Sequence, residues 1–257
     1  GSANNLICKP INSRNFRRAK PGQLPYQTHQ TYQTHQTHQT NSMPLKTPFT
    51  SHYNLRLPVV MAPMFLVSNE AMMQSAMRSG IMGVFPTLNY RREGELEQVV
   101  KALNAFKDRE QCRGSYGVNI IVQKTNPMAA AHLKICADNK VPFYITSLGN
   151  PAEVIAAAHS YGAQVYCDVT NLQHAEKCAR EGCDGFIAVG LGAGGHAGPY
   201  SNFLLVPALR KAFPNIPVIA AGGVATGEGI LSMLALGAAG VSVGTRFIAS
   251  TEAGVSD

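Results

Sequence analysis

The stretch IPVIAAGGVATGEGILSMLALGAAGVSVG, residues 216–244, indicates the fold of the chain. It begins with a short apolar run at 216–223 and ends with a second one at 239–244. The segment between them, 226–236, has the composition and the length of a helix. A strand, a helix and a strand in succession predict two parallel strands with the helix packed across them.

The same alternation extends back along the chain to Leu55. Glycine directly follows several of the predicted helices, as at Gly80, Gly162 and Gly182, where helices commonly end. Eight apolar strands separated by helices predict an α/β protein with a parallel sheet, and the number eight favours a closed (β/α)8 TIM barrel over an open doubly wound sheet. The predicted strands are 57–63, 81–86, 116–122, 142–147, 163–168, 184–190, 216–223 and 239–244, and the predicted helices are 69–79, 94–107, 128–139, 151–161, 171–181, 202–213 and 226–236.

The two ends of the chain depart from this pattern. The sequence stops soon after the eighth strand, so we expect a barrel domain at 43–257 that is truncated there and lacks the C-terminal segment of a standard barrel. Residues 1–42 show no apolar periodicity and contain a repeat of YQTHQT and HQT units, which predicts a disordered, low-complexity, basic tail. We expect the histidines of this tail to be solvated rather than to bind a metal.

Composition restricts the class of protein. The chain has 257 residues, of which 45% are hydrophobic and 14% are charged, as in a globular domain, and no window approaches the roughly 18 apolar residues of a membrane span. Seven basic residues precede the first acidic residue, Glu70, and the others balance the 15 acidic residues, so the net charge of +7 belongs to the N-terminal part and predicts no nucleic-acid partner. The six cysteines show neither a CxxC motif nor metal-ligand spacing, so we expect free thiols in a reducing compartment, which favours the cytoplasm. The Arg-rich, acid-free N-terminus leaves the mitochondrion as an alternative.

A glycine-rich loop with one histidine follows the sixth predicted strand. It has the sequence GLGAGGHAG, residues 190–198. Active sites of (β/α)8 barrels lie in the loops at the carboxyl ends of the strands, so we expect His196 to project into that face. Gly194 and Gly195 let the backbone approach a flat ligand, because they carry no Cβ. The histidines on predicted helices, His132, His159 and His174, are interpreted instead as surface or hydrogen-bonded core residues.

The loops after the seventh and eighth strands predict a phosphate site. Phosphate sites in barrels are frequently made by these two loops together with a helix N-terminus, and the expected backbone donors are Gly222, Gly223, Gly244 and Thr245. At the other end of the series, Pro63 ends the first strand in MAPM, and Asn119 interrupts an apolar strand in GVN. A buried asparagine needs hydrogen-bond partners, which a heterocyclic ligand would supply.

Several of these motifs together resemble the nitronate monooxygenase family, formerly called 2-nitropropane dioxygenases. They are APMFLVSN, GVFPTLN, YGVNIIVQKTNP, VPFYITSLGNP, CDVTNLQHA, GLGAGGHAG, VIAAGGVATGEGI and VGTRFIAS, and the resemblance covers about residues 58–252. It implies an FMN-dependent barrel that oxidises alkyl nitronates, such as propionate 3-nitronate, with O2 and without a nicotinamide. It also implies His196 as catalytic base or substrate-orienting group, and FMN contacts at Ala62, Pro63, Met64, Asn119, Asp168, Gly194, Gly195, Gly222, Gly223, Gly244 and Thr245.

The resemblance has departures and alternatives. Cys167 stands where related sequences often have a histidine, and the family continues past the point where this chain ends. The alternatives are an FMN-dependent NAD(P)H reductase, of the enoyl-acyl carrier protein or quinone type, and a non-catalytic FMN-binding remnant. An inosine monophosphate dehydrogenase-like enzyme is set aside, because the loop at 190–198 lacks the nucleophilic cysteine that its chemistry uses. The substrate partners are thus a small nitronate or nitroalkane and O2, and an oligomer remains possible.

Overall fold

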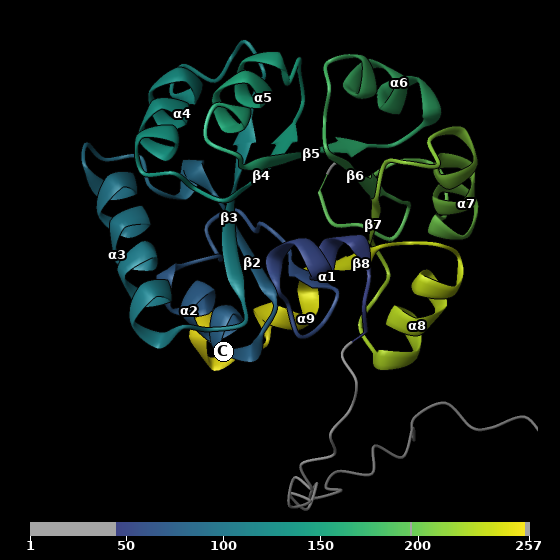
Figure 1. Cartoon of the computed structure of the whole chain (residues 1–257), viewed down its shortest axis with the longest axis horizontal. Coiled ribbons are helices and arrows are strands. Elements are labelled where there is room, and N and C mark those ends of the chain that lie inside the picture. The colour runs from purple at the N-terminus through teal and green to yellow at the C-terminus, as the bar shows by residue number, and fades with distance from the viewer. Residues whose placement is uncertain (1–44, 196, 255–257) are drawn as a thin grey trace, which may run out of the picture. The chain divides into compact units, whose positions relative to one another are not determined.

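Eight parallel strands form a closed barrel in the order β1 to β8, with β8 pairing with β1 (Figure 1). The computed structural model describes residues 45–195 and 197–254. The predicted (β/α)8 barrel is therefore confirmed. The tail expected at 1–42 and His196 lie outside the described residues. The strands are β1 (Val59–Met61), β2 (Met82–Pro86), β3 (Ser115–Ile121), β4 (Phe143–Ser147), β5 (Gln164–Val169), β6 (Gly185–Val189), β7 (Val218–Ala221) and β8 (Gly240–Val243).

One helix follows each of the first seven strands, and these helices surround the barrel (Figure 1). They are α2 (Glu70–Ser79), α3 (Glu95–Glu110), α4 (Ala129–Asp138), α5 (Ala152–His159), α6 (Leu172–Arg180), α7 (Asn202–Ala212) and α8 (Gly227–Ala235). All seven were predicted from the sequence. The short α1 (Pro48–Tyr53) and α9 (Thr245–Ile248), and the single 3-10 turns η1 (Thr87–Asn89) and η2 (Thr251–Ala253), were not.

Local signals fix where the helices begin and end. The Asn69 side chain accepts a hydrogen bond from the backbone N–H of Met72 at 3.0 Å and so caps the start of α2. Asn171 caps α6 in the same way, through the N–H of His174 at 2.8 Å. Gly80 ends α2 in the left-handed conformation, with φ at +77°, which glycine adopts without steric cost. These caps define the start of α2 and of α6 and the end of α2, and so the lengths of the loops that join these helices to their strands.

Two separate cores arise because successive residues of a strand point to opposite faces. The outward-facing residues pack against the helices, whereas Val60, Val84, Ile145 and Ile219 point into the barrel. Helix α1 closes the amino end of the barrel. Its Phe49 is fully buried, and the centroid of its ring lies 5.8 Å from the ring centroids of both Phe143 and Tyr166.

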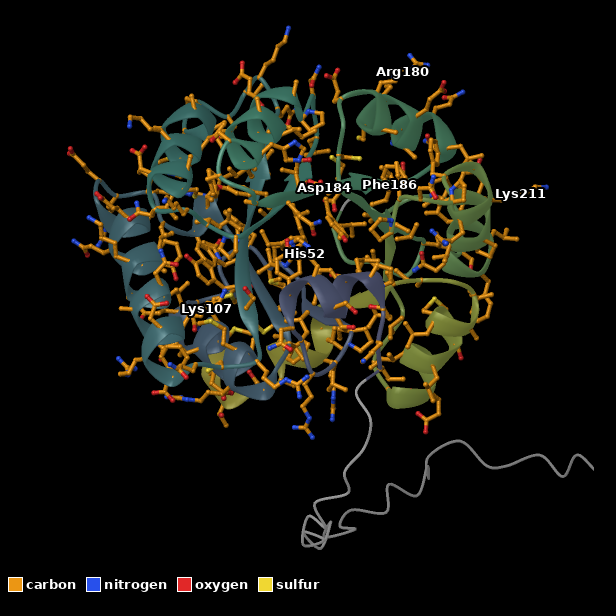
Figure 2. All side chains as sticks on the ribbon, in the orientation of Figure 1. His52, Lys107, Arg180, Asp184, Phe186 and Lys211 are labelled. Atoms are coloured by element: carbon orange, nitrogen blue, oxygen red, sulfur yellow. The ribbon has the colours of Figure 1, made fainter. Side chains whose placement is uncertain are left out.

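The pictures show the same layering. In Figure 1, α1 lies across the end of the barrel that faces the viewer, and His52 marks it in Figure 2. Arg180 and Lys211 extend from α6 and α7 away from the strands (Figure 2). These two charged side chains thus lie outside the ring of helices, and the cluster of residues that point into the barrel is apolar.

The last described residues return to the first helix of the ring. Asn69 donates to the backbone carbonyl of Glu252 at 2.8 Å, and the Ser75 hydroxyl donates to the Glu252 carboxylate at 2.8 Å. The yellow C-terminal segment accordingly lies beside α2 in Figure 1. Within the described ranges, none of the helices is both long enough and apolar enough to cross a membrane.

Candidate functional site

A cavity of about 1140 Å³ opens at the carboxyl ends of the strands. Its size exceeds the range of roughly 300–1,000 Å³ that is usual for a single small-molecule pocket. The structure brings together there all the described residues that the motifs singled out for FMN. These are Ala62, Pro63, Met64, Asn119, Asp168, Gly194, Gly195, Gly222, Gly223, Gly244 and Thr245. The predicted catalytic residue, His196, lies outside the described residues.

Three polar side chains form a chain of hydrogen bonds along one wall. Asn119, Ser147 and Asp168 face inward near the ends of β3, β4 and β5. The Asn119 amide donates to the Ser147 hydroxyl at 2.8 Å and to the carbonyl of Ile145 at 3.2 Å, and the Ser147 hydroxyl donates to the Asp168 carboxylate at 2.5 Å. The motifs identified Asn119 and Asp168 but missed Ser147. Its signal was a polar residue at the end of an otherwise apolar strand, two positions after Ile145.

Burial changes the acidity of Asp168. Removal from water disfavours the charged carboxylate and raises its pKa to about 6, although the hydrogen bond from Ser147 acts in the opposite direction. Near neutral pH the carboxylate is therefore mostly ionised. It then acts only as a hydrogen-bond acceptor.

The glycines on the opposite side differ in what they do. Gly222 has φ at +111°, and a Cβ there would lie 2.4 Å from the backbone nitrogen of Ala193, so this glycine lets two loops pack backbone to backbone. The Gly223 N–H donates to the Gly192 carbonyl at 3.1 Å. The Gly223 N–H therefore joins the two loops, and its role as a phosphate donor stays a prediction.

Gly194 has no such internal role. A Cβ on Gly194 would meet no atom within 4 Å, and its φ lies outside the positive range. Gly195 also borders open space but has φ at +75°, which favours glycine for conformational reasons. Gly194 thus leaves free space at the cavity wall that a side chain would occupy. Such a surface suits close approach of a ligand.

The side of the cavity with the predicted phosphate site carries a cation that the motifs did not identify. Gly244 and Thr245 stand at the start of α9, and Arg246 follows them and also lines the cavity. A guanidinium matches phosphate geometry well. The available signal was its position directly after the VGT segment.

A polar face of α6 borders the cavity on the other side. His174, Lys177, Cys178 and Glu181 line it at spacings of three, four and seven residues, which place them on one side of a helix. His174 is exposed, as expected of a surface histidine, and it also lines the cavity, where one ring nitrogen is 2.9 Å from the Thr170 hydroxyl. The Glu181 carboxylate accepts a hydrogen bond from the Asn150 amide at 3.1 Å.

The other two helix histidines do not line this cavity. His159 pairs with Asp184 at 2.8 Å, as expected of a hydrogen-bonded histidine. His132 is buried, and its Nδ1 atom has no partner among the described residues. Its burial lowers the pKa of the imidazole, which keeps the ring neutral.

Cys167 lies at the predicted position, at the end of β5 and on the cavity wall. The Thr146 hydroxyl donates to its sulfur at 3.1 Å. A hydrogen bond with Cys178 lowers the pKa of this thiol, but Cys183 and burial outweigh it and raise the pKa to about 12. The described part of the chain contains no group of three His, Cys, Asp or Glu side chains that could hold a metal ion.

The donor set fits FMN. An FMN molecule has an anionic phosphate at one end and, along the rest of its length, ribityl hydroxyls and a ring N–H that donate hydrogen bonds. The cavity offers Arg246 and a helix start on one side, acceptors at Asn119 and Asp168 on the other, and the open backbone of Gly194 between.

Comparison with known families gives a match over much of the chain. Residues 95–257 match the family model described as nitronate monooxygenase. A nitronate monooxygenase from Paraburkholderia phytofirmans is 36% identical over 137 residues, which make up 49% of this chain and 37% of that protein.

Two other curated relatives match over a longer stretch. They come from Mycobacterium tuberculosis and Rhodococcus jostii, and both are named (3aS,4S,5R,7aS)-5-hydroxy-7a-methyl-1-oxo-octahydro-1H-indene-4-carboxyl-CoA dehydrogenase. They are 31% and 32% identical over 84% and 83% of this chain. The chain spans 59% and 58% of their lengths.

Solved structures show the same barrel. FabK from Thermotoga maritima is 32% identical with a TM-score of 0.72, and the match covers 81% of this chain and 64% of that one. Nitroalkane oxidase from Streptomyces ansochromogenes has a TM-score of 0.69 at 24% identity, over 80% of this chain and 70% of that chain. The second likeness supports the fold alone.

Proposed function

Because the chain belongs to the nitronate monooxygenase family, we propose that it binds FMN in the barrel cavity and oxidises alkyl nitronates, such as propionate 3-nitronate, with O2. The observation that carries the proposal is the convergence of eleven motif residues on a single cavity. They come from the ends of β1, β3 and β5 and from the loops after β6, β7 and β8. Residues so far apart in sequence meet only in the folded barrel.

Each part of the cavity has a task in holding the cofactor. Thr245 and Arg246 bind the phosphate through backbone N–H groups and the guanidinium. Asn119 and Asp168 accept hydrogen bonds from the donors of the cofactor, and Pro63 and Met64 supply apolar surface beneath the ring. Bound FMN would supply the transfer of electrons from the nitronate to O2.

His196 is the proposed catalytic residue. An imidazole near neutral pH can accept the carbon-bound proton of a neutral nitroalkane, or donate a hydrogen bond to a nitronate oxygen when it is protonated. The proposal rests on the motif GLGAGGHAG, in which this is the single titratable residue.

The test begins with the absorbance spectrum of the purified protein, with and without added FMN. Oxygen uptake is then followed after addition of propionate 3-nitronate without any nicotinamide. We expect a bound flavin and oxygen uptake that His196→Ala abolishes, and His159→Ala serves as the matched control because His159 pairs with Asp184 and does not line the cavity. Bound flavin without uptake would contradict nitronate oxidation, and no binding of FMN would contradict the cofactor.

A second function is favoured by the relatives that match most of this chain. Two of them are named as dehydrogenases of an indene-carboxyl-CoA, and FabK from Thermotoga maritima has a similar fold at 32% identity. The alternative is an FMN-dependent dehydrogenase or NAD(P)H reductase that acts on a thioester or a quinone. NAD(P)H consumption with an enoyl thioester or a quinone, or flavin bleaching by an acyl-CoA without O2, would establish it. Flavin binding with no turnover in any assay would indicate a non-catalytic flavin protein.

A further inference from the structure

The polar chain at the ends of β3, β4 and β5 depends on its central residue. We infer that Ser147 is a positioning residue that orients Asn119 and Asp168, so that this wall presents acceptors alone to the hydrogen-bond donors of FMN. The inference rests on the proposed FMN binding and adds a residue that neither the motifs nor the family resemblance identified. It concerns the cofactor's binding, and its test does not require turnover.

Counting protons fixes the direction of each hydrogen bond. A serine hydroxyl has one proton, and that of Ser147 points at the Asp168 carboxylate, 2.5 Å away. The Ser147 oxygen is therefore free to accept from the Asn119 amide at 2.8 Å. The second amide proton of Asn119 goes to the Ile145 carbonyl at 3.2 Å.

The orientation of the Asn119 amide follows from these contacts. A reversed amide would bring its oxygen against the Ile145 carbonyl, which is repulsive because neither group has a proton. Both amide protons are thus used within the protein, and the Asn119 carbonyl oxygen is the atom left for a ligand. Asn119 is 7% exposed and lines the cavity, so a ligand can reach it.

Asp168 presents the second acceptor. Among the described residues, Ser147 is the one hydrogen-bond donor to its carboxylate. The other carboxylate oxygen is left for a ligand. The wall therefore selects a ligand edge that carries N–H or O–H donors, and the ring N–H and ribityl hydroxyls of FMN meet this requirement.

The charge of Asp168 makes this recognition depend on pH. The titratable or charged side chains that share the cavity are His174, Lys177, Cys178 and Glu181 of α6, Cys167 of β5 and Arg246 of α9. None of the described contacts of these groups is a hydrogen bond or an ion pair with the Asp168 carboxylate. Burial raises the pKa of Asp168 to about 6, and the Ser147 hydroxyl opposes this rise. Because FMN donors favour the ionised form, binding is strongest above pH 6 and weakens as the pH falls through 6.

Removal of the hydroxyl has two consequences. In Ser147→Ala the carboxylate loses its donor, so the pKa of Asp168 rises further and the pH at which FMN binding weakens moves upward. The Asn119 amide also loses a partner and can rotate. Both changes weaken FMN binding, so the dissociation constant of Ser147→Ala should exceed that of the wild type at neutral pH, and the ratio of the two should grow as the pH falls.

The experiment measures the dissociation constant of FMN by flavin fluorescence, from below pH 6 to above neutrality, for the wild type, Ser147→Ala and Ser147→Thr. The FMN phosphate itself titrates with a pKa of about 6, which changes FMN binding by the wild type and the variants alike. We therefore compare the ratio of variant to wild-type dissociation constants at each pH, because the effect of the phosphate cancels in this ratio. Ser115→Ala is the matched control, since Ser115 is a fully buried serine at the amino end of β3, away from the cavity. We expect Ser147→Thr, which keeps the hydroxyl, to retain most of the affinity, and Ser115→Ala to match the wild type.

The possible results separate this inference from the proposed function. If the wild type binds FMN and Ser147→Ala binds it equally well at every pH, the positioning role is wrong while FMN binding stands. If the wild type does not bind FMN, both are wrong. Thermal unfolding without FMN detects a variant that fails to fold. If Ser147→Ala fails to fold, Ser147→Cys replaces it, since a thiol preserves the shape but is a weaker donor, and its FMN affinity should also fall. In an Asp168→Asn background the pH dependence of the Ser147→Ala ratio should disappear, and its persistence would contradict the mechanism.

Discussion

Replacing Gly194 by alanine distinguishes a glycine that serves a ligand from one that serves the fold. Gly194 has no positive φ, and an added Cβ would meet nothing within 4 Å. Substitution of a glycine by alanine in a compatible conformation stabilises a protein by about 0.4–1 kcal/mol, because the unfolded chain loses freedom. The apoprotein of Gly194→Ala should therefore be as stable as the wild type or slightly more stable.

The same methyl group should interfere with FMN. If the cofactor lies against the Gly194 backbone, the extra carbon overpacks the contact, which typically costs about 1–3 kcal/mol. FMN affinity then falls by about five- to a hundredfold. The assay pairs flavin fluorescence titration with thermal unfolding in the absence of FMN. Gly227→Ala is the control, since Gly227 also borders open space but does not line the cavity.

Two outcomes would refute the reasoning. Wild-type FMN affinity in Gly194→Ala would mean that no part of the cofactor approaches this backbone. A loss of stability without FMN would mean that Gly194 is required by the fold, in conflict with the free space around it. A parallel loss of affinity in Gly227→Ala would show that the effect is not specific to the cavity wall.

Three further predictions concern other parts of the barrel. Gly222→Ala should lower the free energy of unfolding by about 2–3 kcal/mol in chemical denaturation without FMN, since it has φ at +111° and its Cβ would lie 2.4 Å from the Ala193 nitrogen; unchanged stability would contradict the loop packing. Phe49→Ala should cost about 3–5 kcal/mol, because this ring closes the amino end of the barrel, while the FMN affinity of the folded fraction stays the same. Lys177 lines the cavity, and the described residues place no ion-pair partner within 4 Å of it, so its charge is available to a carboxylate of the substrate. Lys177→Glu should therefore raise the KM for propionate 3-nitronate more than the KM for an alkyl nitronate without a carboxylate, and salt should reduce this difference. Equal effects on both substrates would contradict a role for this charge.

The fold could be predicted because each element carries its own signal. The strands are short apolar runs, and the helices between them end at glycines such as Gly80, Gly162 and Gly182, all of which have positive φ. The short α1 was missed because a six-residue helix shows too little periodicity. Its importance depends on burial of Phe49 beneath residues about a hundred positions away, which no local pattern reveals.

The site was predictable to the extent that its motifs are local. The glycine loops and the residues at strand ends were assigned to one face because all parallel strands of a barrel end on the same side. Contacts between loops were not predictable. The Gly223 N–H bonds to the Gly192 carbonyl, and this pairing exists only because the loops after β6 and β7 are neighbours in the barrel. The inward face of α6 was missed for the same reason, since the side of a helix that meets a cavity depends on how its strand is oriented.

The charges around the cavity are divided in a way that bears on the choice of reaction. The strand ends of β3 to β5 present acceptors, and the start of α9 presents donors and a cation, so these two sides together match the two ends of one cofactor. The two proposed activities would use the same flavin, so we expect neither side to discriminate between a nitronate and an acyl thioester. A further polar surface is the face of α6, where Lys177 and His174 line the cavity together with the hydrogen-bonded pair Asn150 and Glu181. We therefore predict that variants of α6 change the two proposed activities differently, while variants of the strand ends affect both alike.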